Sequence, residues 1–241
     1  MILALESSTA EIGVALADGA GLLAACTVRA DRRHVETVHP AIEHVCSLAG
    51  VTPRDLDAVA VDVGPGMLTA VRVGVAAAKG IALACGVPTV PCTSLDVLAH
   101  AARAAGRVVP VVDLRRGEVA WDIGAGAGGR SGARAGTPSE LAADLAALGV
   151  PVLLVGDGAH RHGDAVVAAA RALHAPEPRV ERDDLAAPPV AALAALALAR
   201  LARGTTASAL EVAALYLRPP DARANFTSRA APPVAHGAGA G

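Results

Sequence analysis

Residues 2–17 have the sequence ILALESSTAEIGVALA, and this stretch sets the beginning of the fold. Its first four residues are all apolar, as in a buried strand, and a polar turn follows them. Residues 11–17 alternate between larger and small side chains, and this period of two is typical of a strand. Asp18-Gly19 is a hairpin turn signal, after which residues 21–29 supply the returning strand. The chain is therefore predicted to open with three consecutive strands.

A helix, a strand and a second helix follow the hairpin. Apolar side chains in residues 33–49 recur at spacings of three and four, which predicts a helix with one apolar stripe. Pro40 inside this helix predicts a kink or a restart. Residues 58–63 (AVAVDV) are typical of a buried strand, and Gly64-Pro65-Gly66 breaks the chain before a long helix at 67–85. Alternating strands and helices indicate an α/β protein.

A second half with a similar order begins near residue 107. Two strands at 108–113 and 118–123 form another hairpin, and residues 124–136 are predicted to be a glycine-rich loop. The remaining expected elements are strands at 87–91 and 151–155, helices at 94–105, 139–148, 162–173 and 189–203, and a late strand or docking segment at 214–218. Two successions of strand hairpins and strand–helix alternation predict an α/β protein of two related halves.

We divide the chain accordingly into two lobes and a tail. The N-terminal lobe comprises residues 1–105, and the C-terminal lobe comprises residues 106–229, with a terminal segment that can pack back on the first lobe. Residues 230–241 are rich in Gly, Ala and Pro and are predicted to be a disordered tail.

The composition argues against RNA binding by this chain alone. Its net charge is −2 at pH 7 with a pI near 6.4, whereas nucleic-acid-binding domains usually carry a basic patch or a pI above about 9. The aromatic residues are Trp121, Tyr216 and Phe226, too few for the stacking platforms that recognise single-stranded RNA. We therefore expect no strong direct binding of RNA.

The sequence also predicts a cytoplasmic protein that makes no membrane contact. Residues 1–5 lead directly into a strand pattern, without the basic segment of a secretory signal. The longest apolar run, residues 69–86, contains Arg72 and Lys79 and is short for a membrane span.

The helix at 67–85 carries a ridge of small side chains. Ala70, Gly74, Ala78 and Ala82 recur at steps of four, so they lie along one face and permit close approach of another helix. Most other positions are apolar too, which is typical of a buried helix. The partner of this surface is the core of the same chain, a second protein, or both, and the sequence leaves these alternatives open.

Two short stretches are candidate phosphate contacts. Gly64 and Gly66 precede a helix, and the N-terminal amides of a helix favour anions. Ser7, Ser8 and Thr9 follow the first strand, where such a loop touches phosphate in nucleotide-binding proteins. Ordinary turn chemistry also explains both stretches, and neither the P-loop pattern GxxxxGK[ST] nor the dinucleotide pattern GxGxxG is present.

The sequence predicts no catalytic residue and no metal site. His34, His39 and His44 are spaced five apart, which rotates successive side chains by about 140° around a helix. Metal-binding pairs on a helix instead stand three or four residues apart. Asp113 and Glu118, at the ends of the second hairpin, are a candidate acid pair, but no motif supplies a nucleophile or base beside them.

The order of four motifs resembles one known family. Residues 64–74 (GPGMLTAVRVG) resemble the GPGSFTGxRxG signature of the TsaB (YeaZ) family. Residues 2–16 resemble its first strand, loop and hairpin, residues 112–121 (VDLRRGEVAW) its D-A-R-x-G-E-V-Y segment, and residues 214–223 (ALYLRPPDAR) its terminal P-x-Y-L-R segment. The matches occur in order across about residues 1–223, which makes them more specific together than singly.

The resemblance implies a two-lobed fold of the actin, sugar-kinase and Hsp70 type with a degenerate nucleotide cleft. It implies a non-catalytic scaffold subunit that forms a dimer with the catalytic TsaD and works with the ATPase TsaE. The complex transfers threonylcarbamoyl to the adenosine next to the anticodon of ANN-decoding tRNAs. No cofactor of the chain's own is implied, although ATP or ADP at the partner interface stays open.

In this family the first two helices of the N-terminal lobe carry the dimer interface. Here these are residues 33–49 and 67–85. The expected interface therefore consists of apolar residues on both helices, namely Val35, Val38, Ile42, Val45, Ala70, Val71, Gly74, Ala78 and Ala82. Because an exposed apolar patch is a liability for a monomer, we expect a homodimer when the protein is alone, with TsaD replacing one copy in the working complex.

Departures from the family pattern keep other interpretations open. Met67, Leu68 and Ala70 stand where the family usually has Ser, Phe and Gly, which weakens the phosphate-binding interpretation. Glu6-Ser7-Ser8 is closer to the opening of TsaD itself, but TsaD proteins are longer and carry a histidine pair at i,i+4 that this sequence lacks. The alternatives are a nucleotide-binding enzyme, acting as an ATP-dependent transferase or peptidase, and a self-associating homodimer outside any pathway.

Overall fold

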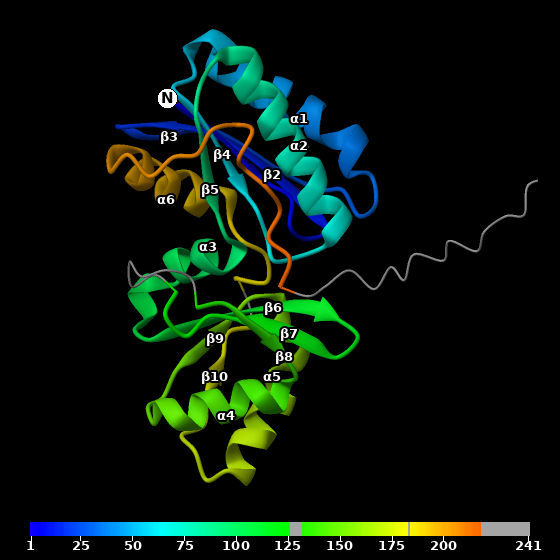
Figure 1. The fold of residues 1–241 in the computed structure, drawn as a ribbon, viewed down its shortest axis with the longest axis vertical. Helices are drawn as coiled ribbons and strands as arrows, with labels where there is room; N and C mark the ends of the chain where they lie inside the picture. The colour runs from blue at the N-terminus through cyan, green and yellow to red at the C-terminus, as the bar shows by residue number, and fades with distance from the viewer. Residues whose placement is uncertain (126–131, 183, 218–241) are drawn as a thin grey trace, which may run out of the picture.

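The computed structural model describes residues 1–125, 132–182 and 184–217 of the chain. Two five-stranded sheets, one above the other in Figure 1, form two lobes. The first sheet has the order β3-β2-β1-β4-β5. Its strands are β1 (Ile2–Glu6), β2 (Glu11–Asp18), β3 (Gly21–Arg29), β4 (Ala58–Asp62) and β5 (Thr89–Cys92). The predicted opening of three consecutive strands is confirmed.

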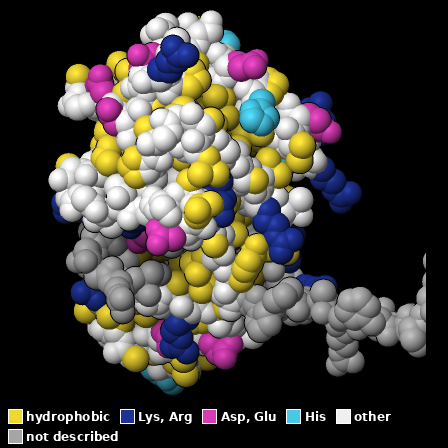
Figure 2. Space-filling view, turned by 45° about the horizontal axis from the view of Figure 1, so that its top comes forward, with side chains coloured by type: hydrophobic (Ala, Val, Ile, Leu, Met, Phe, Trp, Pro, Cys, Tyr) yellow, Lys and Arg dark blue, Asp and Glu magenta, His cyan; other side chains and the backbone are white. Residues whose placement is uncertain are grey.

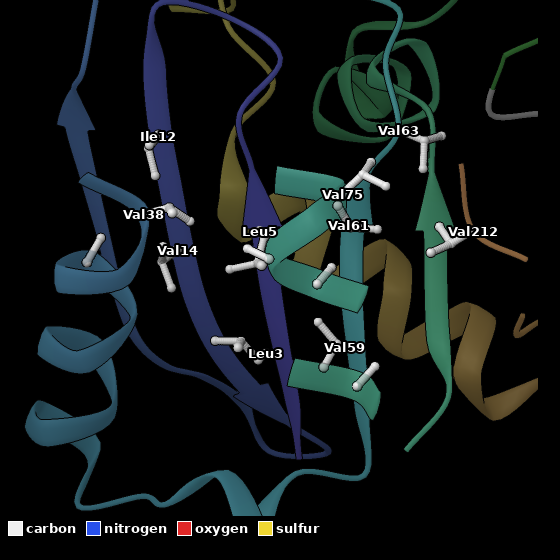
Figure 3. Packing of buried hydrophobic residues seen from close by; sticks show 14 of the residues in the cluster. Leu3, Leu5, Ile12, Val14, Val38, Val59, Val61, Val63, Val75 and Val212 are labelled. Atoms are coloured by element: carbon white, nitrogen blue, oxygen red, sulfur yellow. The ribbon is translucent and has the colours of Figure 1, made fainter. Parts of the chain in front are cut away.

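Helices cover both faces of the first sheet. On one face lie α1 (His34–Ala49) and α2 (Leu68–Cys85), and on the other lies α6 (Val190–Ala202). Figure 3 shows side chains of α1 and α2 meeting those of β1, β2 and β4. Strands β1 and β4 are buried throughout, and this burial on two faces explains their continuous apolar sequences. Pro40 lies inside α1, which continues through it as one helix.

The second lobe repeats the topology of the first. Its sheet has the order β10-β9-β6-β7-β8, in which each strand takes the place of its counterpart five strands earlier. The strands are β6 (Val108–Arg115), β7 (Glu118–Trp121), β8 (Arg134–Gly136), β9 (Leu153–Val155) and β10 (Arg179–Val180). Helices α4 (Pro138–Leu148) and α5 (Asp157–Ala172) pack on one face. The prediction of two related halves is confirmed by this shared strand order.

Helix α3 (Ser94–Ala101) belongs to the cores of both lobes. Val97 packs among residues of the first sheet and α6. Leu95 and Leu98 are fully buried against the second sheet, in a cluster with Val108 and Val155. The lobes are therefore joined by a shared helix as well as by the covalent chain.

Residues 205–217, which we call the C-terminal strap, join the two lobes a second time. The strap pairs with β5 through two backbone hydrogen bonds of 2.9 Å between Thr89 and Ala207. Lys79 of α2 then donates to the carbonyl oxygens of Leu210 and Val212, at 3.4 and 3.1 Å. The strap ends at Leu217, which packs against the cluster around α3 in the second lobe.

Several predicted elements differ from the observed ones. Helix α3 ends at Ala101 and a short 3-10 turn, Arg103–Ala105, completes the predicted span. Helix α5 begins at Asp157, several residues earlier than predicted. Residues 214–217 form no strand, although the Leu215 amide donates to the Val63 carbonyl. Strand β8 lies inside the predicted glycine-rich loop, since three residues are too short for a periodic signal.

The predicted lobe boundaries need one correction. The two sheets divide between β5 and β6, but α6 lies within the range 106–229 and packs on the first sheet. The physical reason is the apolar face of α6, where Val190 and Leu193 meet alanines of β1 and β2. The predicted tail, 230–241, lies outside the described residues.

By length and composition, α2 is the one helix among the described residues that could cross a membrane. In this fold the inward face of α2 packs against the first sheet.

Substitution Leu98→Ala tests the packing of α3 against the second lobe. We expect it to lower the free energy of unfolding by about 2–5 kcal/mol, because it leaves a cavity in the cluster through which α3 packs against the second sheet. Leu210→Ala, at a side chain that is 75% exposed, is the matched control and should change stability by about 0.5 kcal/mol or less. Denaturant unfolding measures both, and equal effects would contradict the burial of Leu98 between α3 and the second sheet.

Candidate partner interface

An apolar groove runs between α1 and α2 on the side away from the sheet. Its volume is about 450 Å³. The lining comes from both helices and consists of Val35, Val38, His39, Val73, Ala76, Ala77, Gly80, Ile81 and Ala84. Valine, isoleucine, alanine and glycine make up this lining apart from His39. Figure 2 shows hydrophobic side chains gathered on the first lobe, with charged side chains mostly towards the rim of that face. A surface of this kind is suited to an apolar partner.

The predicted interface on the small-residue ridge is wrong in detail, because the ridge faces the sheet. The residues of the predicted set that are buried within the chain are Val38, Val45, Ala70, Val71, Gly74, Ala78 and Ala82. Of the predicted set, Val35 and Val38 line the groove, Val35 is 67% exposed, and Ile42 is half-buried. Small residues are required on this inward face, because α2 lies very close to the loop after β1. A methyl group on Gly74 would overlap the Ser7 hydroxyl.

The groove uses a second stripe of small residues on the same helix. Val73, Ala76, Gly80 and Ala84 recur at spacings of three and four, offset from the ridge around the helix axis. The sequence therefore contained the signal for this face as well. This second stripe was not predicted because most positions of α2 are apolar. The first stripe of small residues alone already explained close packing.

Two acidic side chains meet at the carboxyl end of the first sheet. Glu6 ends β1 and Asp62 ends the neighbouring parallel strand β4, and both are buried. Burial, together with the negative charge of Asp62, raises the pKa of Glu6 to about 8. Burial also raises the pKa of Asp62 to about 7. Among the described residues, Asp62 Oδ2 has no hydrogen-bond partner, whereas Oδ1 accepts from Gly64 N and Ser94 Oγ.

The five candidate phosphate contacts lie together, but they bond to the protein itself. The Ser8 amide and hydroxyl both donate to Glu6 Oε1, at 2.6 and 2.5 Å, and the Ser7 hydroxyl donates to the Ala70 carbonyl at 2.9 Å. The Ser8 carbonyl accepts from the Met67 amide at 2.7 Å, at the start of α2.

The other candidates on this loop are likewise engaged. Thr9 Oγ1 accepts from the Glu11 amide, and the Gly64 amide donates to Asp62. Gly66 leaves no room for a side chain, since the Ser8 backbone lies against its Cα. The loop is thus arranged as a tight packing element, and the observed bonds support ordinary turn chemistry more than phosphate contact.

A cavity of about 290 Å³ opens beside this loop. Glu6, Glu11 and Asp184 contribute acidic groups to its lining, opposite Pro188 and Pro189. The acidic side chains of Glu11 and Asp184 make this cavity unfavourable for phosphate groups. Among residues 1–125, 132–182 and 184–217, no group of three or more His, Cys, Asp or Glu side chains is placed to hold a metal ion.

Asp113, one of the two residues of the candidate acid pair at the second hairpin, is engaged by basic side chains. It accepts from Arg161 at 2.9 Å and contacts His162 Nε2 at 3.1 Å. Burial would raise the pKa of Asp113, but the hydrogen bonds from His162, the Arg115 amide and Arg161 outweigh it and lower that pKa. The Asp113 amide donates to Asp157 at 2.9 Å, and burial raises the pKa of Asp157 to about 6. The basic side chains of this cluster thus offset the negative charge of Asp113.

The repeated five-stranded sheets, helices on both faces of the first sheet and the shared α3 define a two-lobed protein of the actin and sugar-kinase type. A ROK hexokinase from Thermus thermophilus superposes with a TM-score of 0.50 at 16% identity, over 84% of this chain and 98% of that one. At this identity the likeness concerns the fold alone.

Comparisons with more similar proteins identify the relatives. The chain is 26% identical to a Pseudomonas aeruginosa protein described as similar to peptidase YeaZ, with a TM-score of 0.73, over 90% of this chain and 99% of that one. It is 32% identical to the tRNA threonylcarbamoyladenosine biosynthesis protein TsaB of Escherichia coli K12 over 123 residues, which are 50% of this chain and 53% of that protein. The matched stretch spans about half the length of this curated relative.

A family model for TsaD, the tRNA N6-adenosine threonylcarbamoyltransferase, matches residues 28–132. This stretch contains α1, α2 and the groove between them. The resemblance to the TsaB (YeaZ) family that the four motifs predict is confirmed, and so is the two-lobed fold.

Two glycines of α2 test which face of the helix is inside. Gly74→Ala should destabilise the protein by about 1–3 kcal/mol, because the added methyl group meets Ser7. Gly80→Ala is the control, since its methyl group meets no atom within 4 Å and should stabilise the helix by about 0.5–1 kcal/mol. Opposite signs in denaturant unfolding support the observed orientation, whereas two stabilising substitutions would contradict it.

Glu6 should make stability depend on pH. Its pKa is about 8 in the fold against 4.5 ordinarily, so the folded state holds a proton that the unfolded state releases. The resulting stability is fully present below about pH 4.5 and is lost as the pH rises through about 8.

Glu6→Gln keeps an oxygen acceptor for Ser8 and removes the titration. We expect a smaller fall in Tm between roughly pH 5 and pH 8 than in the unchanged protein. Glu11→Gln, on the same cavity, is the control. An unchanged pH dependence in Glu6→Gln would show that this carboxyl group is not held protonated.

Proposed function

We propose that this chain is the scaffold subunit of a bacterial complex that makes threonylcarbamoyladenosine in tRNA, and that it binds a TsaD-type catalytic subunit through the groove between α1 and α2. The observation that carries the proposal is this apolar groove, on a fold that matches a YeaZ-like structure over 90% of the chain. The relatives in sequence are named for the same biosynthesis, which gives the proposal its reaction.

The groove suits a helical partner. Its floor consists of small side chains on α2, notably Ala76, Gly80 and Ala84, which allow another helix to approach closely. Val35 of α1 projects beside this floor and offers apolar area that a partner would bury. We place the contact on these outward residues and not on the buried ridge.

The hydrogen bonds of the loop that follows β1 fit a non-catalytic role. The serines of the first loop donate to Glu6 and to the Ala70 carbonyl, so their hydroxyl groups serve the fold. Glu6 is buried and its pKa is raised to about 8, which makes its carboxyl group a poor ligand for Mg²⁺ at neutral pH. We therefore propose that TsaD supplies the transfer chemistry and a TsaE-like ATPase the nucleotide hydrolysis, with any ATP or ADP bound at the interface with TsaD.

The same proposal assigns tRNA binding to the partners and the complex to the cytoplasm. A net charge of −2 provides little attraction for a phosphate backbone. This chain's contribution is then to hold the catalytic subunit in its working shape.

Ala76→Glu tests the groove as the partner interface. A carboxylate in an apolar contact must be buried without a partner, so we expect affinity for the TsaD-type protein of the same organism to fall at least 100-fold. Leu83→Glu is the matched control, because Leu83 lies on the same helix, is 56% exposed and does not line the groove. Calorimetry on purified proteins measures both, with thermal melting to verify that each variant folds.

Modification of tRNA in a reconstituted mixture provides the second measurement. Loss of modification with Ala76→Glu and its retention with Leu83→Glu would support the scaffold role. Modification by this chain without a TsaD-type protein would overturn it, as would full affinity of Ala76→Glu for that protein.

A further inference from the structure

Helices α1 and α2, which line the groove, both begin without a side-chain cap. Arg33 precedes α1 and Met67 precedes α2, and no side-chain hydrogen bond caps either helix. Helices α3 and α4 differ, because the hydroxyl groups of Thr93 and Thr137 accept from backbone amides of their first turns. The starts of α1 and α2 are therefore held by other contacts.

Residues 7–9, which follow β1 and which we call the first loop, hold the start of α2. The Met67 amide donates to the Ser8 carbonyl at 2.7 Å, so a backbone amide that α2 cannot satisfy itself finds a partner. The Ser7 hydroxyl donates to the Ala70 carbonyl at 2.9 Å, within the first turn of the helix. Two hydrogen bonds thus attach α2 to this loop at its beginning.

The same loop holds the start of α1. His34, the first residue of α1, is buried, and its Nε2 lies 2.9 Å from the Thr9 carbonyl oxygen. Because a carbonyl oxygen only accepts hydrogen bonds, Nε2 of His34 carries the hydrogen of this contact. The next carbonyl, that of Ala10, accepts from the amides of Ala30 and Asp31 just before α1, both at 2.9 Å. The two groove helices are thus anchored to neighbouring residues of one short segment.

The first loop is itself fixed to the sheet. The Ser8 amide and hydroxyl donate to Glu6 Oε1 at 2.6 and 2.5 Å, and both Ser7 and Ser8 are buried. Glu6 ends β1, which lies at the centre of the first sheet between β2 and β4. The loop therefore places the starts of α1 and α2 relative to the sheet and to each other.

We propose that His34 is a positioning residue for the partner groove, because through the first loop it fixes the start of α1 relative to the start of α2. This inference rests on the proposed function, since it assigns His34 a role in partner binding. His34 does not line the groove, so it acts without touching the partner.

The place of His34 in α1 gives it this influence. The residues of α1 that line the groove are Val35, Val38 and His39, all within five residues of His34. The opposite wall extends much further, from Val73 to Ala84 along α2. A shift of the first two turns of α1 therefore moves one whole wall of the groove against the other.

His34→Leu removes the hydrogen-bond donor and leaves the Thr9 carbonyl without it. We expect affinity for the TsaD-type protein to fall about tenfold, because only a fraction of the molecules then holds the groove in its binding shape. His34→Gln keeps an N–H donor of similar reach and should restore the affinity to within about threefold of the unchanged protein. Calorimetry measures the affinities, and thermal melting verifies that each variant folds.

Val45→Ala is the matched control on the same helix. Val45 is buried, does not line the groove and stands eleven residues, or roughly 16 Å, further along α1. Its truncation leaves a cavity and lowers stability without reaching the first loop, so partner affinity should stay unchanged. Equal losses of affinity in His34→Leu and Val45→Ala would overturn the proposal, as would a His34→Gln that binds as weakly as His34→Leu.

Hydrogen exchange of the free protein provides a measurement that needs no partner. The Met67 amide reports on the contact between the first loop and α2. His34→Leu changes α1, yet it should speed exchange at Met67 at least about fivefold beyond the effect of global stability, because the loop joins the two helices. Val45→Ala should not. An unchanged rate at Met67 in His34→Leu would show that the loop does not connect them.

Ser7→Ala reaches the same loop from the side of α2 and keeps the inference testable if His34→Leu does not fold. It removes one oxygen atom and with it the bond to the Ala70 carbonyl. We expect faster exchange at Met67 and a loss of partner affinity of roughly threefold. Unchanged values of both would contradict the positioning role of the loop.

Ala76→Glu separates this inference from the proposed function. If Ala76→Glu loses partner affinity while His34→Leu keeps it, the groove is the interface and His34 does not position it. If the unchanged protein fails to bind the TsaD-type protein, or Ala76→Glu binds it fully, the proposed function fails instead. Exchange at Met67 then still decides whether His34 and the first loop hold the two helices together.

Discussion

The contact between α2 and the first sheet is the constraint on which the rest of the structure depends. Ala70, Gly74 and Ala78 allow the helix to lie close to β1 and β4, and the Ser7 hydroxyl bonds to the Ala70 carbonyl at 2.9 Å. Side chains of ordinary size on this face would push the helix outwards, because protein interiors are close-packed. The approach of α2 also sets the distance to α1, and with it the shape of the outer groove.

The two lobes show how one topology can hold opposite electrostatics. The first strand of each half carries a carboxylate near its end, Glu6 in β1 and Asp113 in β6. Burial beside Asp62 keeps Glu6 protonated, whereas Arg161 and His162 keep Asp113 ionised. A duplicated fold thus places equivalent groups in equivalent positions, while their neighbours determine their charge. In both lobes neighbouring residues bond to the carboxyl group, Ser8 to Glu6 and Arg161 to Asp113.

The sequence predicted most of the fold because its strongest signals are periodic. The hairpin at Asp18-Gly19, the apolar strands and the long helix at 67–85 all appear within a few residues of their predicted bounds. Short elements such as β8 were not predicted, since three residues are too few to show a periodic pattern. The packing of α6 on the first sheet was not predicted either, because the sequence of an alanine-rich helix does not specify which of two sheets it covers.

The candidate site was predicted less well, for a related physical reason. A helix that is apolar on all sides packs inwards and outwards with similar residues, so the sequence could not distinguish the ridge at Gly74 from the groove at Gly80. The distinction depends on Ser7, which is distant in the sequence and close in space. Likewise, the inward bonds of Ser8 required knowledge of where Glu6 lies.

Lys79 gives the C-terminal strap an unusual chemical property. It is the only lysine in the sequence, and its ammonium group donates to the carbonyl oxygens of Leu210 and Val212. Reagents that acylate amines therefore find a single side-chain target in this chain, besides the α-amino group of Met1. Acetylation removes the positive charge and two of the three ammonium protons, which weakens the attachment of the strap to α2. The labelling rate of this one amine thus depends on its hydrogen bonds to the strap.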